Sequence, residues 1–204
     1  MPTSATGHPE PGTRARRRAR VRAEAEQIAL DMFAAHGFEA VTMGDIAAAL
    51  DVSERTLFRY FDSKESLLDP RHEEIVARLV TVLAERPSDE SAFTAVHNTL
   101  RVLSEEFDED RDAMALRTAI IGGCPALQSH LLHRQTELED AIGAVVAERA
   151  GVDAADLRPR VFAAATVGAL RVAIETWLSG DPQDDLLDHT NTALDLLANG
   201  LADL

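Results

Sequence analysis

The sequence predicts an all-α protein of about nine helices. Hydrophobic residues make up 46% of the 204 residues, whereas aromatic residues make up only 4%. Alanine and leucine dominate the apolar set and favour helices, because strands are enriched in β-branched and aromatic side chains. Apolar residues recur at helical spacing between short loops, and no segment shows the alternation that is typical of a strand.

The N-terminal segment predicts a disordered tail followed by a long helix. Residues 1–12 are rich in proline, glycine, serine and threonine, a composition typical of a tail. From Thr13 to His36 apolar residues recur at helical spacing, and Gly37 is a typical C-terminal stop.

Three further helices are expected before residue 86. Thr42 and Ser53 are typical N-caps, the first for a short helix over 43–50 and the second for a helix over 54–61. A fourth helix is expected from about Lys64 to Glu85. The remaining helices are expected at 90–107, 111–121, 129–150, 156–178 and 182–201.

Charge is distributed unevenly along the chain. The formal net charge is −15, which by itself argues against a nucleic-acid partner. However, residues 1–68 hold 9 basic and 10 acidic residues, whereas residues 69–204 hold 11 and 25. Six of the nine residues from Arg14 to Arg22 are arginine. A local basic patch of this kind is what contact with phosphates requires.

Several function classes lack their sequence signatures. Cys124 is the only cysteine, so an intramolecular disulfide and a cysteine zinc cluster are excluded, which fits a reducing cytoplasm. We expect no membrane span, signal peptide or cofactor, and no catalytic motif indicates an enzyme. His130 and His133 could share a metal ion, but two ligands alone do not make a site.

The three helices between residues 21 and 61 match the requirements of a helix-turn-helix. The helix before the turn would pack through Ile46, Ala47 and Leu50. The helix after it is short, so that exposed residues can enter the major groove while Leu57 and Phe61 anchor it from behind.

Residues 42–68 resemble the TetR family of transcriptional regulators. The matching elements keep their type and spacing: Thr42, Ile46-Ala47, Val52-Ser53, Thr56-Leu57, Tyr60-Phe61, Ser63-Lys64-Glu65 and Leu67. Two positions depart from the family. Leu50-Asp51 stands where Ala-Gly is usual, and Asp tolerates a positive φ better than most residues. Phe58 stands where Tyr is frequent, and we expect it only to pack.

The resemblance implies a set of DNA contacts. Thr42, Lys64 and Tyr60 would touch phosphates. Ser53, Arg55, Thr56 and Arg59 would be exposed on the third helix, with Arg55 placed to contact a guanine. The alternatives are that Thr42 and Ser53 act only as caps and that the arginines are solvated charges. The N-terminal arginines would form an arm that contacts phosphates or the minor groove, and the alternative is a solvated helix face. These residues are Arg14, Arg16, Arg17 and Arg18.

The last two helices resemble the dimerisation helices of the family. Residues 161–178 are mostly apolar on all sides, so we expect this helix to be buried on both sides. The final helix carries one apolar stripe, which includes Leu187, Leu194 and Leu201. The resemblance implies a four-helix bundle in a homodimer, whose reading helices lie about 34–36 Å apart on a palindromic operator.

The stretch from Arg117 to Trp177 loosely resembles the TetR regulators with acyl-coenzyme A-like ligands, including the mycofactocin type. Arg171 could face an anionic ligand or pair with Glu175. The candidate pocket residues are Phe93, His97, Met114, Arg117, Phe162, Arg171 and Trp177. Ordinary core packing is the alternative for each of them.

The resulting organisation is a tail (1–12), a helix-turn-helix DNA-binding domain (13–63) and a helical ligand-binding and dimerisation domain (64–204). The leading hypothesis is a cytoplasmic repressor that binds a palindromic operator as a homodimer and is released by a small apolar or acyl-type effector. The alternatives are a regulator without a small-molecule ligand, and a helical enzyme or carrier.

Overall fold

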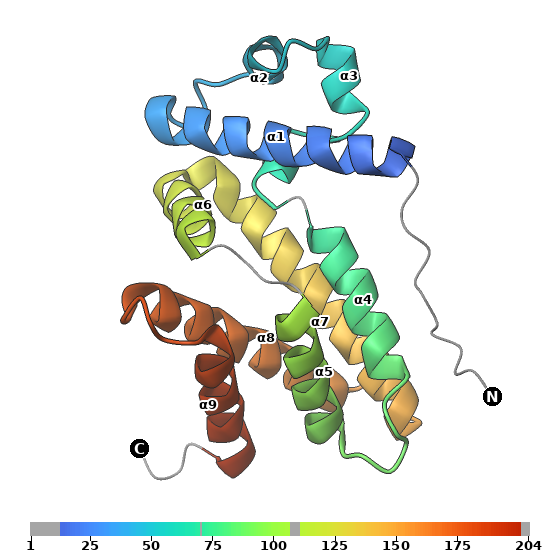
Figure 1. Ribbon diagram of the computed structural model, residues 1–204. Helices are drawn as coiled ribbons and strands as arrows, with labels where there is room; N and C mark the ends of the chain where they lie inside the picture. Colours follow the sequence, from blue (N-terminus) through green and yellow to red (C-terminus); the bar gives the residue numbers. More distant parts are fainter. Residues whose placement is uncertain (1–12, 70, 107–110, 201–204) are drawn as a thin grey trace, which may run out of the picture. The chain divides into compact units, whose positions relative to one another are not determined.

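The computed structural model describes residues 13–69, 71–106 and 111–200, and every regular element within these ranges is a helix (Figure 1). This confirms the all-α class. The predicted tail at residues 1–12 lies outside the described ranges. The chain divides into an N-terminal unit, Met1–Pro70, and a C-terminal unit, Arg71–Leu204.

The N-terminal unit is built on its first helix. It comprises α1 (Thr13–His36), α2 (Met43–Ala49), α3 (Glu54–Phe58) and the 3₁₀ turn η1 (Glu65–Leu67). α1 packs against α2 and η1, and α2 packs against α3. Each element contributes fully buried apolar side chains, among them Ala29 and Phe33 of α1, Ile46 of α2, Leu57 of α3 and Leu67 of η1.

Two predicted helix boundaries in this unit are wrong. α3 ends at Phe58 rather than Phe61, although the amides of Tyr60 and Phe61 still donate to the Leu57 carbonyl. No continuous helix runs from Lys64 to Glu85, because η1 is followed by a separate helix that starts at His72. The sequence has a proline at position 70, which removes a helical donor and disfavours helical backbone in the residue before it.

The division of the chain into two units falls after Pro70, later in the sequence than the boundary predicted between residues 63 and 64. η1 packs on α1, and Leu67 and Leu68 are both buried. These two leucines therefore complete the core of the N-terminal unit instead of opening the next one, which places the boundary after Pro70.

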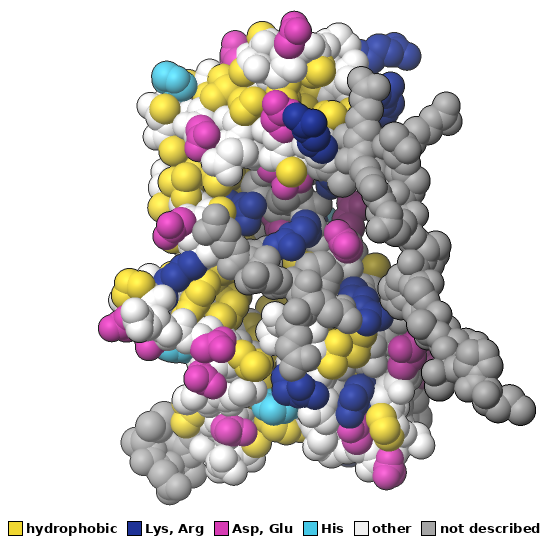
Figure 2. Space-filling model, in the orientation of Figure 1, with side chains coloured by type: hydrophobic (Ala, Val, Ile, Leu, Met, Phe, Trp, Pro, Cys, Tyr) yellow, Lys and Arg dark blue, Asp and Glu magenta, His cyan; other side chains and the backbone are white. Residues whose placement is uncertain are grey.

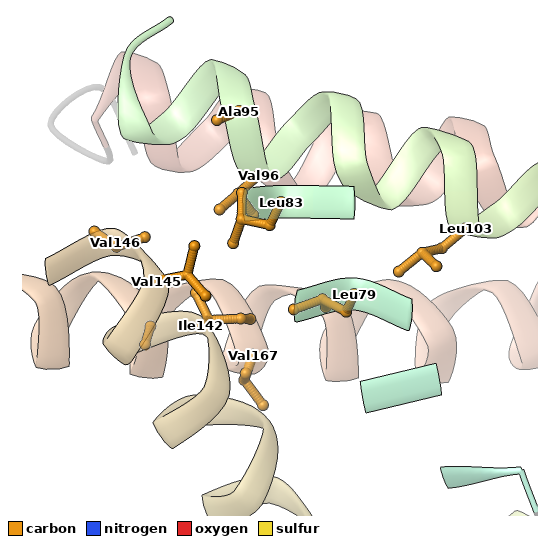
Figure 3. Packing of buried hydrophobic residues seen from close by; sticks show 10 residues of the cluster. Leu79, Leu83, Ala95, Val96, Leu103, Ile142, Val145, Val146 and Val167 are labelled. Atoms are coloured by element: carbon orange, nitrogen blue, oxygen red, sulfur yellow. The ribbon is translucent and has the colours of Figure 1, made fainter. Parts of the chain in front are cut away.

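Seven elements form the described part of the C-terminal unit. They are α4 (His72–Ala84), α5 (Ala92–Glu106), α6 (Arg111–Gly123), the 3₁₀ turn η2 (Pro125–Leu127), α7 (Gln128–Ala150), α8 (Leu157–Ser179) and α9 (Leu186–Asn199). α7 packs against α4 and α8, and α8 packs along α9. Aliphatic side chains from α4, α5, α7 and α8 converge in one core cluster, which includes Leu79, Val96, Ile142 and Val167 (Figure 3).

An arginine of α7 fixes the loop between α4 and α5. The Arg149 guanidinium donates to the backbone carbonyls of Arg86, Pro87 and Glu90. The Glu90 carboxylate accepts from Arg86 and Asn98, and the hydrogen bond from Arg86 lowers the pKa of Glu90. The loop carbonyls thus gain charged donors, which holds the C-terminal end of α4 on α7.

α8 differs from expectation in its burial. It spans 23 residues, and an 18-residue window within it has a mean hydropathy of 1.4, so by length and composition alone it could cross a membrane. The core helix of a soluble protein passes the same test, so this finding does not contradict the expectation of no membrane span. Within one chain, α8 is not buried on both sides. Ala163, Val167 and Trp177 are buried, whereas Val161 and Val172 are exposed.

The turn between α2 and α3 requires a left-handed residue. Asp51 has φ 54°, and it is the one non-glycine residue with positive φ in the described part of the chain. The Val52 amide donates to the Ala47 carbonyl at 3.0 Å, and the Asp51 amide donates to the Ala48 carbonyl at 3.2 Å. These two bonds form a Schellman motif, in which the left-handed residue ends the helix.

Substitutions at Asp51 should change the local stability of α2 and α3. A β-branched side chain is strained at positive φ, so Asp51→Val should lower the free energy of local opening by about 1–2 kcal/mol. Asp51→Gly, the matched control, should leave it unchanged or raise it by about 0.5 kcal/mol. Amide hydrogen exchange of α2 and α3 measures both changes. Equal protection in the Val and Gly variants would contradict the strain argument.

Candidate nucleic-acid interface

The start of α2 is closed by a reciprocal capping box. The Asp45 amide donates to Thr42 Oγ1 at 3.1 Å, and Asp45 Oδ2 accepts from the Thr42 amide at 2.9 Å and from the Thr42 hydroxyl at 2.6 Å. The side-chain and backbone hydrogen bonds from Thr42 lower the pKa of Asp45. Thr42 is exposed and acts as the predicted cap, while its phosphate contact stays a prediction.

The start of α3 is fixed by a second cap. The Thr56 amide donates to Ser53 Oγ at 3.2 Å, and the two hydroxyls lie 2.8 Å apart. Ser53 is exposed and acts as the predicted cap. Thr56, which was predicted to be exposed, is partly buried because it lies against this cap. The first amides of a helix have no acceptor within the helix, so they can donate hydrogen bonds to an anionic group.

α3 has one buried side and one side that faces solvent. Leu57 is only 1% exposed and anchors the helix, as predicted. Arg55 and Arg59 are exposed, and the Arg59 guanidinium lies 5.4 Å from the centre of the Tyr60 ring. The predicted reading residues therefore share a short, anchored helix whose polar side is accessible.

Phe58 does not pack as predicted. It is 44% exposed, although an aromatic side chain of this size is usually buried. The sequence did contain a signal for this position. If Leu57 and Phe61 anchor the helix four residues apart, then Phe58 lies one residue away from the buried stripe. Phe58 therefore joins the exposed side of α3 as a residue that sequence reasoning missed.

The basic residues of the first helix fall into two groups. Arg14, Arg16, Arg17 and Arg18 have their backbone in α1, while their side chains lie outside the described part of the structure. The Arg22 guanidinium lies 5.1 Å from the centre of the Phe61 ring and 3.9 Å from a Glu26 oxygen. Arg22 is thus engaged within the N-terminal unit.

Lys64 is also engaged within the unit. Its Nζ donates to the carbonyl oxygens of Phe38 and Val41, at 2.7 and 2.9 Å. The predicted phosphate contact of Lys64 therefore competes with contacts to the protein's own loop.

The candidate pocket residues lie on three helices, α5, α6 and α8, and a pocket that they share stays a prediction. Phe93 and His97 stack on α5 with ring centres 6.2 Å apart, and Phe162 packs against the core cluster. Met114 and Arg117 lie on α6, where both are partly buried.

The two candidate pocket residues near the end of α8 have other partners. Arg171 is exposed and donates to Glu175 at 2.8 Å, which is the ion pair expected as the alternative. Trp177 is buried, with its Nε1 donating to the Asp184 carbonyl at 2.8 Å and the Arg111 guanidinium 4.8 Å from its ring centre. Among the described residues no group of three or more His, Cys, Asp or Glu could hold a metal ion.

Comparison with known families assigns both units. Residues 27–69 match the family described as bacterial regulatory proteins, tetR family. Residues 90–202 match the MftR C-terminal domain, which accounts for more than half of the chain.

Individual relatives agree with these families. HTH-type transcriptional regulator TcmR of Streptomyces glaucescens is 33% identical over 174 residues, which cover 82% of this chain and 77% of TcmR. MftR of Mycobacterium tuberculosis, assigned to the regulation of mycofactocin biosynthesis, is 28% identical over 186 residues, covering 91% and 93% of the two chains.

A solved structure shares the fold. Thermus thermophilus FadR, a TetR-family repressor crystallised with lauroyl-CoA, has a TM-score of 0.57 and 21% identity, covering 88% of this chain and 94% of FadR. These relatives are transcriptional regulators and not enzymes. The chain belongs to the TetR family of bacterial DNA-binding transcriptional regulators, with a C-terminal domain of the MftR type.

Proposed function

We propose that the chain is a cytoplasmic, ligand-responsive repressor that binds a palindromic operator in double-stranded DNA as a homodimer. The observation that carries this proposal is the geometry of α3. The helix is capped by Ser53, anchored by the buried Leu57, and presents Arg55, Phe58 and Arg59 to solvent. A short anchored helix with an accessible basic side fits the major groove.

The exposed residues of α3 suit different base edges. The Arg55 guanidinium can donate two hydrogen bonds to O6 and N7 of guanine. Phe58 offers an apolar surface that suits the methyl group of thymine. Phosphate contacts by Thr42, Arg59 and Tyr60, and by the arginines in the first turns of α1, would add affinity without sequence preference.

The acidic residues of the C-terminal unit support the assignment of DNA binding to the N-terminal unit. Acidic and basic side chains are mixed on the face of this unit shown in Figure 2, but acidic residues outnumber basic ones by 25 to 11 among residues 69–204. Such a surface repels phosphates. DNA binding is therefore confined to the N-terminal unit.

Arg55→Ala should remove base preference. Losing a bidentate contact to guanine costs about 1–3 kcal/mol on the operator, while affinity for random DNA changes little. Fluorescence anisotropy with operator and scrambled duplexes at one salt concentration measures both affinities. Arg101→Ala, an exposed arginine of α5 outside the interface, serves as the control. Equal losses on both duplexes would contradict the assignment of Arg55.

The homodimer is proposed from an exposed apolar stripe on α8. Leu157, Val161, Ala164, Gly168 and Val172 follow one another at spacings of three or four residues. Leu157, Val161 and Val172 are all more than 45% exposed, and a Cβ added at Gly168 would meet no atom within 4 Å. A stripe of large residues around a small centre suits close approach of a second helix. The predicted stripe of α9, by contrast, is largely used inside the chain, where Thr190 and Leu194 are buried.

Val161→Asp should therefore separate the dimer. A carboxylate in the centre of an apolar interface has no partner and is costly to desolvate. Sedimentation equilibrium should show a monomer that has lost cooperative operator binding. Leu132→Asp is the matched control, because Leu132 is 64% exposed on α7, outside the stripe. If both variants dimerise like the unchanged protein, another surface forms the dimer.

The effector is proposed from the packing of α6. None of its residues is buried, although it carries Met114, Leu116, Ile120 and Ile121. These side chains lack the full contacts of a core, so an apolar ligand could supply them. The lauroyl-CoA complex of FadR supports an acyl-type ligand. Such a ligand would favour an arrangement of the dimer whose half-site spacing no longer matches the operator. It can shift the dimer toward that arrangement only by as much as its affinity for it exceeds its affinity for the DNA-binding arrangement.

Footprinting on the chain's own upstream DNA tests the operator and the effector together. Two protected half-sites one DNA turn apart are expected, and lauroyl-CoA should remove the protection while coenzyme A alone should not. Protection that persists at saturating lauroyl-CoA would rule out this ligand class. It would favour the second candidate, a TetR regulator that responds to no small molecule.

A further inference from the structure

Lys64 is the single lysine of the chain, which otherwise carries its positive charges on arginine. Its backbone lies between α3 and η1 and is fixed by two neighbouring serines. The Ser66 amide donates to Ser63 Oγ at 3.2 Å, and the Ser66 hydroxyl donates to the Ser63 carbonyl at 2.7 Å. The lysine side chain therefore starts from a well-defined position.

The Lys64 ammonium group is occupied by the loop between α1 and α2. Nζ donates to the carbonyl oxygens of Phe38 and Val41, and it lies 4.1 Å from the centre of the Phe38 ring. An ammonium group has three N–H donors. Two carbonyls and one aromatic face account for all three.

The loop that Lys64 holds determines where α2 begins. Gly37 ends α1 with φ +84°, Phe38 is buried and packs on Phe33 with ring centres 4.9 Å apart, and Val41 is buried just before the cap Thr42. The carbonyls of Phe38 and Val41 flank this short loop. A donor that bridges them fixes the path of the chain from the end of α1 to the start of α2.

The geometry also explains why this position is not arginine. An ammonium group is compact and directs its donors tetrahedrally, whereas a guanidinium group is a planar fork. A tetrahedral donor can reach two carbonyls and an aromatic face at once. A planar fork of greater length would have to displace the loop or the Phe38 ring.

We infer that Lys64 is a positioning residue for DNA binding, which holds the α1–α2 loop so that Thr42, α2 and thereby α3 are presented correctly. It acts through these contacts and not through a phosphate. The inference rests on the DNA binding of the family and not on the proposed dimer or effector. Failure of either of those proposals leaves it intact.

The salt dependence of binding separates the two roles. Lys64→Met keeps the apolar chain but removes the charge, and it should weaken binding to operator and random DNA by about tenfold, as expected for loss of hydrogen bonds to a charged donor. The slope of log affinity against log salt should stay unchanged. A lost phosphate contact would instead reduce its magnitude by about 0.9. Lys64→Arg should fail to restore affinity, and Arg101→Met should behave like the unchanged protein.

These measurements are made at a temperature where circular dichroism shows each variant to be folded. A slope reduced by about one contact would assign Lys64 to a phosphate and overturn the inference. Unchanged affinity in folded Lys64→Met would leave the lysine a purely structural role and overturn it as well. Full affinity of Lys64→Arg would show that the ammonium geometry is not required.

Amine labelling tests the same inference without a variant. Because the chain has one lysine, acetylation by an activated ester followed by mass spectrometry reports on Lys64 alone among the side chains. Labelling should be slow relative to N-acetyl-lysine amide in the same tube, and operator DNA should not change its rate. Rapid labelling that operator DNA suppresses would place the amine on the DNA and overturn the inference.

Discussion

The helix-turn-helix of the chain depends on one constraint, which is that its helices α2 and α3 are too short to be stable alone. α2 has 7 residues and α3 has 5, whereas an isolated helix shorter than about 12–15 residues is marginal in water. Both helices therefore rely on contacts at their ends. Thr42 and Ser53 close the starts, Asp51 ends α2 in the left-handed region, and Lys64 fixes the loop in front of α2.

This constraint also explains how the surface of α3 is divided. A helix of five residues has room for one buried anchor, Leu57, and every other long side chain must face elsewhere. Arg55, Phe58 and Arg59 are exposed for this reason. The short length that makes α3 unstable on its own also leaves most of its side chains accessible to solvent. The excess of acidic residues belongs to the C-terminal unit, whereas residues 1–68 hold nearly equal numbers of acidic and basic residues.

Prediction from sequence succeeded where the physics is local. Both caps, the end of α1 at His36 and the left-handed residue at Asp51 follow from residue type over three or four positions, and all were found. It failed where distant packing decides. Leu67 and Leu68 read as the start of a long helix but complete the core on α1. The ligand pocket stays a prediction, since Arg171 pairs with Glu175, as the alternative expected, and Trp177 is buried against the turn before α9.

The sequence by itself determined the helical class, the family and the positions of the turn and caps, because periodicity, capping and the spacing of the motif are properties of neighbouring residues. Only the tertiary structure decided the roles of Lys64, Phe58 and α8. The carbonyls that bind Lys64 lie 23 and 26 residues away in sequence. The exposure of Phe58 and of the α8 stripe depends on which surfaces the other helices cover. Such contacts are set by how the chain folds back on itself, which no short stretch of sequence encodes.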